Sequence, residues 1–149
     1  MDPTKQPGLQ FSQIILVGAK FNHRPDVFAL PPTTLVEGMQ LHIEAKVGGK
    51  PGDPHAIIGI RAFTDDDPEL LYRFDVEVAA LVSQVPNEEN LDPYEYAQNM
   101  GAAALYPFLR ETVASITLRG RFGPVWLKPF NFALAEGVKT DAVEESQPD

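Results

Sequence analysis

Residues 105–132 have the sequence LYPFLRETVASITLRGRFGPVWLKPFNF, in which a helical pattern runs into a segment rich in Gly, Pro and aromatic residues. Apolar residues recur at helical spacing as far as Ile116. Gly120 is then expected to end the helix, with Arg119 in its last turn. Beyond Pro124, large apolar side chains crowd a segment that is too short and too interrupted by proline to build its own core. These side chains must therefore pack against another part of the protein.

The predicted helix begins well before this stretch. Asp92 is a candidate N-cap, Pro93 suits the first helical position, and Glu95 completes a capping box. We predict one helix from Asp92 to about Leu118.

Two features inside this helix have structural consequences. Pro107 lacks a backbone donor and clashes with the preceding turn, which predicts a kink near residues 103–106. Residues 101–104 are Gly and Ala, and such a small face permits the close approach of another helix.

Four predicted strands precede the helix. Residues 9–22 are apolar on both faces, as expected for a strand that is covered on one side and contacts a partner on the other. Residues 39–47 and 70–82 alternate apolar and polar side chains, and residues 56–63 lie between two segments rich in turn formers. Two hairpins and one Pro-containing crossover, residues 23–38, would connect these strands. The pattern predicts an antiparallel sheet with one solvated face.

Composition excludes several classes of protein. The 149 residues are 44% hydrophobic, which suits a single core. The absence of Cys excludes disulfides, thiol catalysis and cysteine zinc sites, and it fits a reducing compartment. A net charge of -9 disfavours binding to nucleic acid. The sequence has neither a secretory h-region nor a run near the ~20 apolar residues of a membrane span. We therefore expect a cytosolic protein with no nucleic acid or membrane partner.

The chain is expected to contain one folded domain between two short flanking segments. We predict a flexible N-terminus over residues 1–8, the domain over residues 9–137, and a disordered acidic tail over residues 138–149. The tail prediction depends on its four acidic residues and its lack of apolar periodicity.

Three pieces of the opening stretch carry a family resemblance. LYPFLRE (105–111), LRGRFGPVWL (118–127) and KPFNF (128–132) resemble the corresponding region of the SecB family, tetrameric cytoplasmic chaperones that hold unfolded preproteins for export. The order of elements is similar over most of the chain, and the similarity in residues is dense over 101–132.

The resemblance implies both a fold and an activity. The implied fold is α+β, a four-stranded antiparallel sheet with one long helix and a short C-terminal helix packed on one face, assembled as a dimer of dimers. The implied activity is ATP-independent holding of unfolded polypeptide, without catalysis, cofactor or metal.

The resemblance also implies a client-binding groove between the first crossover, the long helix and the C-terminal segment. The residues expected to line it are Phe28, Leu30, Leu41, Leu105, Phe108, Leu109, Phe122, Val125, Trp126, Phe130, Phe132 and Leu134. An alternative interpretation is that these side chains cap the open end of the core, since most aromatic residues are buried.

The sequence has only half of the acidic surface that is expected to contact the export motor SecA. Family members use acidic residues on the exposed sheet face, where this chain has Asp75 and Glu77. The first strand offers Lys20 and Asn22 near Gly18 or Ala19 instead of acidic residues. The two carboxylates also fit a solvated strand face paired with Arg61 and Arg73.

The expected C-terminal helix is short, because its pattern stops by Gly137. Together with the incomplete acidic surface, this favours a duty besides export, such as protecting an antitoxin of a toxin–antitoxin module. Export remains a second expectation.

The catalytic alternative is a hot-dog-like acyl-thioester hydrolase that uses Glu95 or Glu111 on the long helix. A metal site is disfavoured because His23, His42 and His55 are scattered, and only His42 shares a strand face with Glu44.

Overall fold

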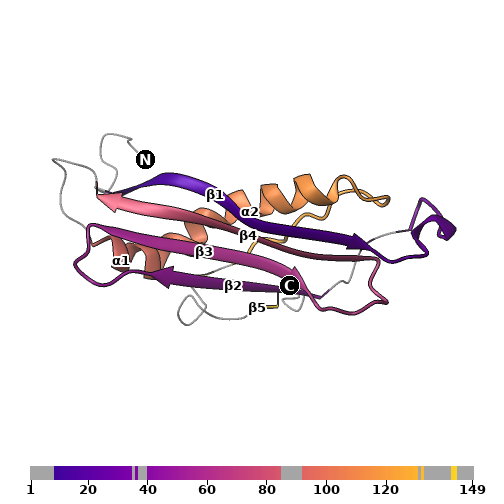
Figure 1. Ribbon diagram of the computed structural model, residues 1–149, viewed down its shortest axis with the longest axis horizontal. Helices are drawn as coiled ribbons and strands as arrows, with labels where there is room; N and C mark the ends of the chain where they lie inside the picture. The colour runs from indigo at the N-terminus through magenta and orange to yellow at the C-terminus, as the bar shows by residue number, and fades with distance from the viewer. Residues whose placement is uncertain are drawn as a thin grey trace.

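A computed structural model describes residues 9–34, 36, 40–84, 92–130, 132 and 142–143. This part of the chain forms one antiparallel sheet, with the α-helices lying behind it in Figure 1. The strands are β1 (Leu9–His23), β2 (Leu41–Gly48), β3 (His55–Thr64), β4 (Tyr72–Gln84) and β5 (Ala142–Val143). The helical elements are η2 (Val27–Ala29), α1 (Pro93–Tyr96), η3 (Ala97–Gly101) and α2 (Ala102–Thr117).

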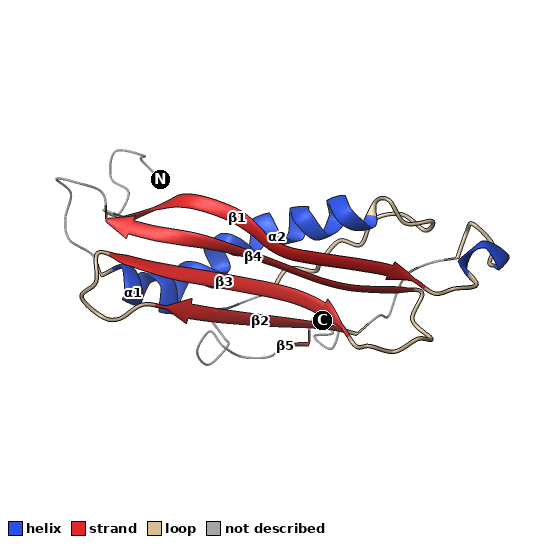
Figure 2. Ribbon diagram, viewed as in Figure 1, coloured by secondary structure: helices blue, strands red, loops and turns tan. Residues whose placement is uncertain are grey.

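The strand order is β1-β4-β3-β2-β5 (Figure 2). Two hairpins join β2 to β3 and β3 to β4, and the crossover after β1 takes the chain past them to β2. β1 pairs with β4, from Leu9 opposite Gln84 to His23 opposite Tyr72, and lies at an edge of the sheet. The four predicted strands are confirmed, with boundaries that differ by at most two residues.

The core lies between the sheet and the helices. Side chains alternate along each strand, so that every second residue of β4 from Tyr72 to Val82 faces α2 and is buried. Each large apolar side chain buried in this way contributes about 1.5–3 kcal/mol. The fully buried members with the largest side chains include Tyr72, Ile43, Ile58, Ile60, Leu105, Leu109, Leu127, Val76, Val82 and Val113.

The predicted helix boundaries are confirmed. The Asp92 carboxylate accepts hydrogen bonds from the Tyr94 N–H (3.2 Å) and from the Gly52 N–H (3.2 Å). One side chain thus caps α1 and holds the β2–β3 turn against it, with Pro93 at the first helical position. The last helical residue of α2 is Thr117.

The irregular turn lies earlier than the sequence predicts. The π-helical turn η3 covers Ala97–Gly101, whereas residues 103–106 are regular α-helix. Ala103 is exposed, so water can bond to the carbonyl that Pro107 leaves unpaired. Gly101 packs closely on β3, where an added Cβ would lie 3.2 Å from Ile58 Cγ1. Part of the small face is therefore used against the chain's own sheet.

Most of the predictions for the two ends fall outside the described residues. These include the N-terminus 1–8 and the short C-terminal helix before Gly137. Within the predicted tail 138–149, the structure describes Ala142–Val143 as strand β5, paired with His42 and Ile43 of β2. The prediction of a tail without secondary structure is wrong at these two residues. The edge of β2 offers them backbone hydrogen-bond partners.

Tyr72 closes one end of the core. Its fully buried ring packs edge-on against Phe21 (centroids 4.9 Å apart) and His23 (5.4 Å). Its hydroxyl donates to the Gly123 carbonyl (2.9 Å) and accepts from the Phe122 N–H (2.8 Å). Burial raises the pKa of Tyr72, which favours the neutral hydroxyl that can both donate and accept. The ring is therefore fixed at both of its ends.

The substitution Gly120→Ala is expected to destabilise the fold. The new Cβ would collide with the Tyr72 hydroxyl oxygen and lie 2.6 Å from Tyr72 Cζ and 2.9 Å from Phe21 Cζ. Because neither ring can move freely, we expect the free energy of unfolding in urea to fall by about 1–3 kcal/mol. Gly48→Ala is the matched control, since a Cβ there meets only Ile57 Cβ, at an ordinary contact distance of 3.8 Å. Equal stability of the two variants would contradict this packing.

Candidate client-binding surface

The segment after α2 turns back along the helix that precedes it. We call residues 120–130 the strap. Thr117 Oγ1 accepts a hydrogen bond from the Val125 N–H (2.8 Å), and Arg110 Nε donates to the Leu127 carbonyl (2.5 Å). The Tyr106 hydroxyl donates to the Lys128 carbonyl. Later residues of the strap bond to earlier residues of α2, so the strap and α2 run antiparallel.

Side chains alternate along the strap. Val125 and Leu127 are buried in the core, whereas Trp126 between them is 55% exposed. Hydrogen bonds from Thr117 and Arg110 of α2 to the backbone at Val125 and Leu127 hold the strap at the two positions whose side chains are buried. Trp126 is thus held at the surface by a fixed backbone.

A hollow of about 380 Å³ lies beside Trp126. It is lined by Tyr106, Pro107, Arg110, Glu111, Trp126 and Pro129. The Arg110 guanidinium lies 5.5 Å from the centroid of the Trp126 ring, within the range of a cation–π contact. A hollow lined by aromatic and proline rings together with a few polar groups suits a side chain of an extended peptide.

The first crossover lies beside the strap through Arg121. Its Nη2 donates to the Leu30 carbonyl (3.1 Å), and its guanidinium carbon lies 5.6 Å from the Phe28 ring centroid and 6.0 Å from that of Phe122. The Arg121 N–H donates to His23 Nε2 (3.1 Å). The structure thus brings Phe28, Leu30 and Phe122 together, and Phe28 is 83% exposed.

Phe132 lies next to the hollow because it adjoins the lining residue Tyr106, and Phe130 adjoins Phe132. Phe132 packs edge-on against Tyr106, with centroids 5.4 Å apart, and against Phe130 at 4.6 Å. Both phenylalanines are half-buried. Phe108 is 46% exposed on α2.

Several residues predicted for the groove lie elsewhere. Leu41, Leu105, Leu109 and Val125 belong to the buried core, because they face the layer between sheet and helix. A client could reach them only if the core opened, so we assign them to support beneath the surface. Leu134 lies outside the described residues. A binding role for the exposed members stays a prediction.

Sequence reasoning did not single out the polar residues that build this surface. Arg110, Arg121, Tyr106 and Thr117 fix the strap and the first crossover. Arg110 and Tyr106 lie within LYPFLRE, whose similarity to the family was noted, but their pairing with a segment far along the chain requires the tertiary structure.

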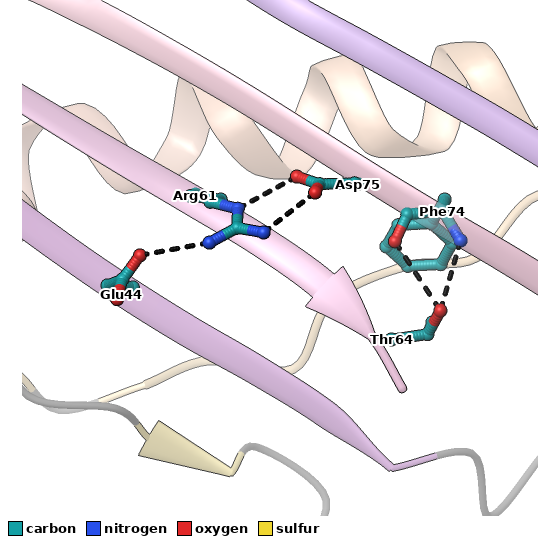
Figure 3. Close-up of polar contacts among 5 residues, drawn as sticks. All are labelled: Glu44, Arg61, Thr64, Phe74 and Asp75. Atoms are coloured by element: carbon teal, nitrogen blue, oxygen red, sulfur yellow. Dashed lines mark hydrogen bonds and ion pairs between the residues drawn. The ribbon is translucent and has the colours of Figure 1, made fainter. Parts of the chain in front are cut away.

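The helix-free face of the sheet carries the two acidic candidates, Asp75 and Glu77. Figure 3 shows that Arg61 holds Asp75 with two hydrogen bonds (2.9 and 2.8 Å) and also contacts Glu44 (3.2 Å). These hydrogen bonds lower the pKa of Asp75. The predicted pairing with Arg61 is confirmed.

The other predicted cation, Arg73, pairs with Asp66 (3.0 Å). Within the described residues Glu77 forms no ion pair. The face is therefore a mixed-charge surface in which Asp75 is already neutralised.

Metal-binding clusters and membrane-spanning helices were both sought among the described residues. In the part of the chain that the structure covers, no group of three or more His, Asp or Glu side chains is placed to hold a metal ion. Among these same residues, none of the helices is long and apolar enough to cross a membrane.

The chain is similar in sequence to SecB proteins. Residues 37–135 match the family described as Preprotein translocase subunit SecB. The protein-export protein SecB of Xanthobacter autotrophicus is 28% identical over 111 residues, which cover 73% of this chain and 69% of that protein. The protein-export protein SecB of Hahella chejuensis is 34% identical over 65 residues, which cover 40% of this chain and 41% of that protein.

Two solved structures have a similar fold. The Mycobacterium tuberculosis SecB-like chaperone, in complex with a ChAD peptide from the HigA1 antitoxin, aligns with a TM-score of 0.59 at 25% identity, over 83% of this chain and 88% of that one. A Streptococcus agalactiae protein of unknown function aligns with a TM-score of 0.52 at 12% identity, over 81% of this chain and 97% of that one, which shows the fold alone. None of these similar proteins supports the thioester-hydrolase alternative, and Glu95 and Glu111 both lie exposed.

The substitution Thr117→Val is expected to loosen the strap. It removes the acceptor of the buried Val125 N–H, and an unpaired buried donor costs about 1–3 kcal/mol. Thr112→Val is the matched control, since Thr112 Oγ1 also donates to a carbonyl of its own helix but, within the described residues, accepts no N–H of the strap. Both variants are compared by urea denaturation and by the fluorescence of Trp126, the one tryptophan of the chain. Equal losses of stability in the two variants would contradict this role of Thr117.

Proposed function

Because the chain belongs to the SecB family of chaperones, we propose that it holds extended, non-native polypeptide on the strap and first-crossover surface without using ATP. The family resemblance noted in the sequence is confirmed. The proposal depends on the exposure of Trp126 and Phe28. Thr117 holds the strap backbone next to Trp126, and Arg121 holds the crossover backbone near Phe28.

The physical basis is burial of apolar surface. Covering exposed apolar area contributes about 25 cal/mol per Å² and demands no particular sequence. Trp126 and Phe28 are large exposed apolar side chains on the strap and the first crossover, which Arg121 holds side by side. A surface whose backbone is held by hydrogen bonds loses less conformational entropy on binding than a free segment would. These features suit a chaperone that accepts many clients.

The assembly state is part of the proposal. β1 is an edge strand, and Ile14, Ile15, Leu16 and Val17 on it are between 39% and 55% exposed. An apolar edge strand favours pairing with another copy. We therefore propose a homotetramer built as a dimer of dimers, within which residues 9–137 form the chaperone domain. Several binding surfaces on one assembly would add avidity along one client.

The client could come from either of two sources. The pairing of Asp75 with Arg61, and the presence of Lys20 and Asn22 on the neighbouring strand, weaken the case for docking to the motor SecA through an acidic face. Protection of an antitoxin is therefore the first candidate duty and export the second, in each case in the cytosol. Binding of purified SecA by the double variant Asp75→Lys with Glu77→Lys, compared with wild type, tests the second.

The holding activity predicts suppression of aggregation. Wild-type protein without nucleotide should keep a chemically unfolded client from scattering light at a stoichiometric ratio. The double variant Phe28→Ser with Trp126→Ser should need several-fold more protein for the same effect, because it removes exposed apolar area without touching the core.

Ile57→Ser is the matched control, since Ile57 is 52% exposed but lies on the helix-free face. It should leave suppression unchanged. No suppression at excess wild-type protein would refute the holding activity, and loss of suppression in Ile57→Ser alone would place the client on the opposite face.

A further inference from the structure

His23 links the end of β1 to the beginning of the strap. The Arg121 backbone N–H donates a hydrogen bond to His23 Nε2 (3.1 Å). The half-buried imidazole ring also packs against Phe21, with centroids 5.1 Å apart, and edge-on against Tyr72 at 5.4 Å. These contacts hold the ring in the position where Nε2 accepts. We call the hydrogen bond between Arg121 and His23 the latch.

The latch joins the two segments that carry exposed aromatic side chains. His23 ends β1 and begins the first crossover, on which Phe28 is 83% exposed. Arg121 lies on the strap, and its guanidinium reaches the crossover again at the Leu30 carbonyl (3.1 Å). Arg121 therefore holds the crossover through two hydrogen bonds, one from its backbone and one from its side chain. Loss of the latch would leave only the second.

The latch requires one protonation state of the His23 ring. A neutral imidazole has one nitrogen that accepts a hydrogen bond, whereas a protonated imidazole has two N–H donors and no acceptor. Because Nε2 accepts from the Arg121 N–H, the proton of the neutral ring belongs on Nδ1. Protonation of Nε2 would set two N–H groups against each other. This step depends on the lone pair of Nε2 and not on the balance of charges around the ring.

The elements packed around the ring carry charged and titratable groups of their own. In the described chain these groups are Tyr72, Arg121, Arg24, Asp26 and Glu69. Burial raises the pKa of Tyr72, so its hydroxyl stays neutral wherever histidine titrates. Arg24 is paired with Asp26 through hydrogen bonds of 2.7 and 3.3 Å. Within the described residues, His23 forms no ion pair with a carboxylate that would hold its charged form in place.

We propose that the latch is a pH-sensitive switch, which holds the strap to the first crossover at neutral pH and releases it at mildly acidic pH. The proposal rests on the proposed holding function and adds a means of regulating the same surface. Histidine in ordinary surroundings changes its charge between about pH 5 and 8, so a modest acidification is enough to open the latch. Once it is open, Phe28 and the beginning of the strap no longer form one continuous surface, and client affinity falls.

Two substitutions fix the latch in each of its states. In His23→Gln, the side-chain carbonyl can accept the Arg121 N–H at every pH, because an amide does not titrate. In His23→Phe, an aromatic ring is retained for packing but no acceptor is left. His55→Gln is the matched control, since His55 is exposed on the helix-free face, where its Nδ1 lies 3.0 Å from Ser83 Oγ.

Client affinity is the first measurement. The client is an unfolded polypeptide without histidine, labelled with tetramethylrhodamine, and its binding is followed by fluorescence anisotropy at about pH 7.5 and about pH 5.5. The wild-type protein and His55→Gln should bind it about three- to ten-fold more weakly at the lower pH, the effect of one lost hydrogen bond. His23→Gln should bind equally well at both pH values, and His23→Phe should bind weakly at both.

Hydrogen exchange of the Arg121 amide is the second measurement, and it needs no client. After correction for the intrinsic dependence of exchange on pH, protection of this amide in the wild-type protein should be several-fold lower at the acidic pH. In His23→Gln its protection should be the same at both pH values.

The possible outcomes separate the switch from the holding function. Equal wild-type affinity at the two pH values, or a loss of affinity in His23→Gln as large as in the wild type, would overturn the switch and leave the holding function intact. Unchanged protection of the Arg121 amide on acidification would overturn the switch whatever the client does. Absence of client binding at both pH values, with protection that still falls in the wild type and not in His23→Gln, would overturn the holding function and support the latch.

Discussion

The surface of this protein depends on the docking of an irregular segment onto α2. A strap without helix or sheet must find hydrogen-bond partners for its buried backbone groups elsewhere. Thr117, Arg110 and Tyr106 supply them from the helix, and the Tyr72 hydroxyl supplies them where the strap begins. With the backbone fixed, Val125 and Leu127 complete the core while Trp126 remains in contact with solvent.

The face that carries the strap and the open face of the sheet differ in how their charged side chains are paired. On the strap side, Arg110 and Arg121 each donate a hydrogen bond to a backbone carbonyl and lie over aromatic rings. On the open face of the sheet, Arg61 is held by Asp75 and Glu44, and a pair partly exposed to solvent contributes little to stability. A face of neutralised ion pairs and a face of exposed aromatic rings suit different partners.

Much of the fold could be predicted from the sequence because its signals are local. Alternation located the strands, and Asp92 with Pro93 located the helix start. The π-helical turn over Ala97–Gly101 could not be predicted, because no local signal in the sequence marks it. Nor could the pattern separate Leu105 and Leu109 from Trp126, since apolar character alone does not say whether another layer covers a side chain.

The central claim is that clients cover Trp126. The most direct measurement is acrylamide quenching of this single tryptophan, in the wild-type protein, with and without a saturating unfolded client that lacks tryptophan. The half-exposed ring should become several-fold less accessible to acrylamide, and its emission should shift to shorter wavelength, as client binds. Suppression of client aggregation with unchanged quenching of Trp126 would contradict the account.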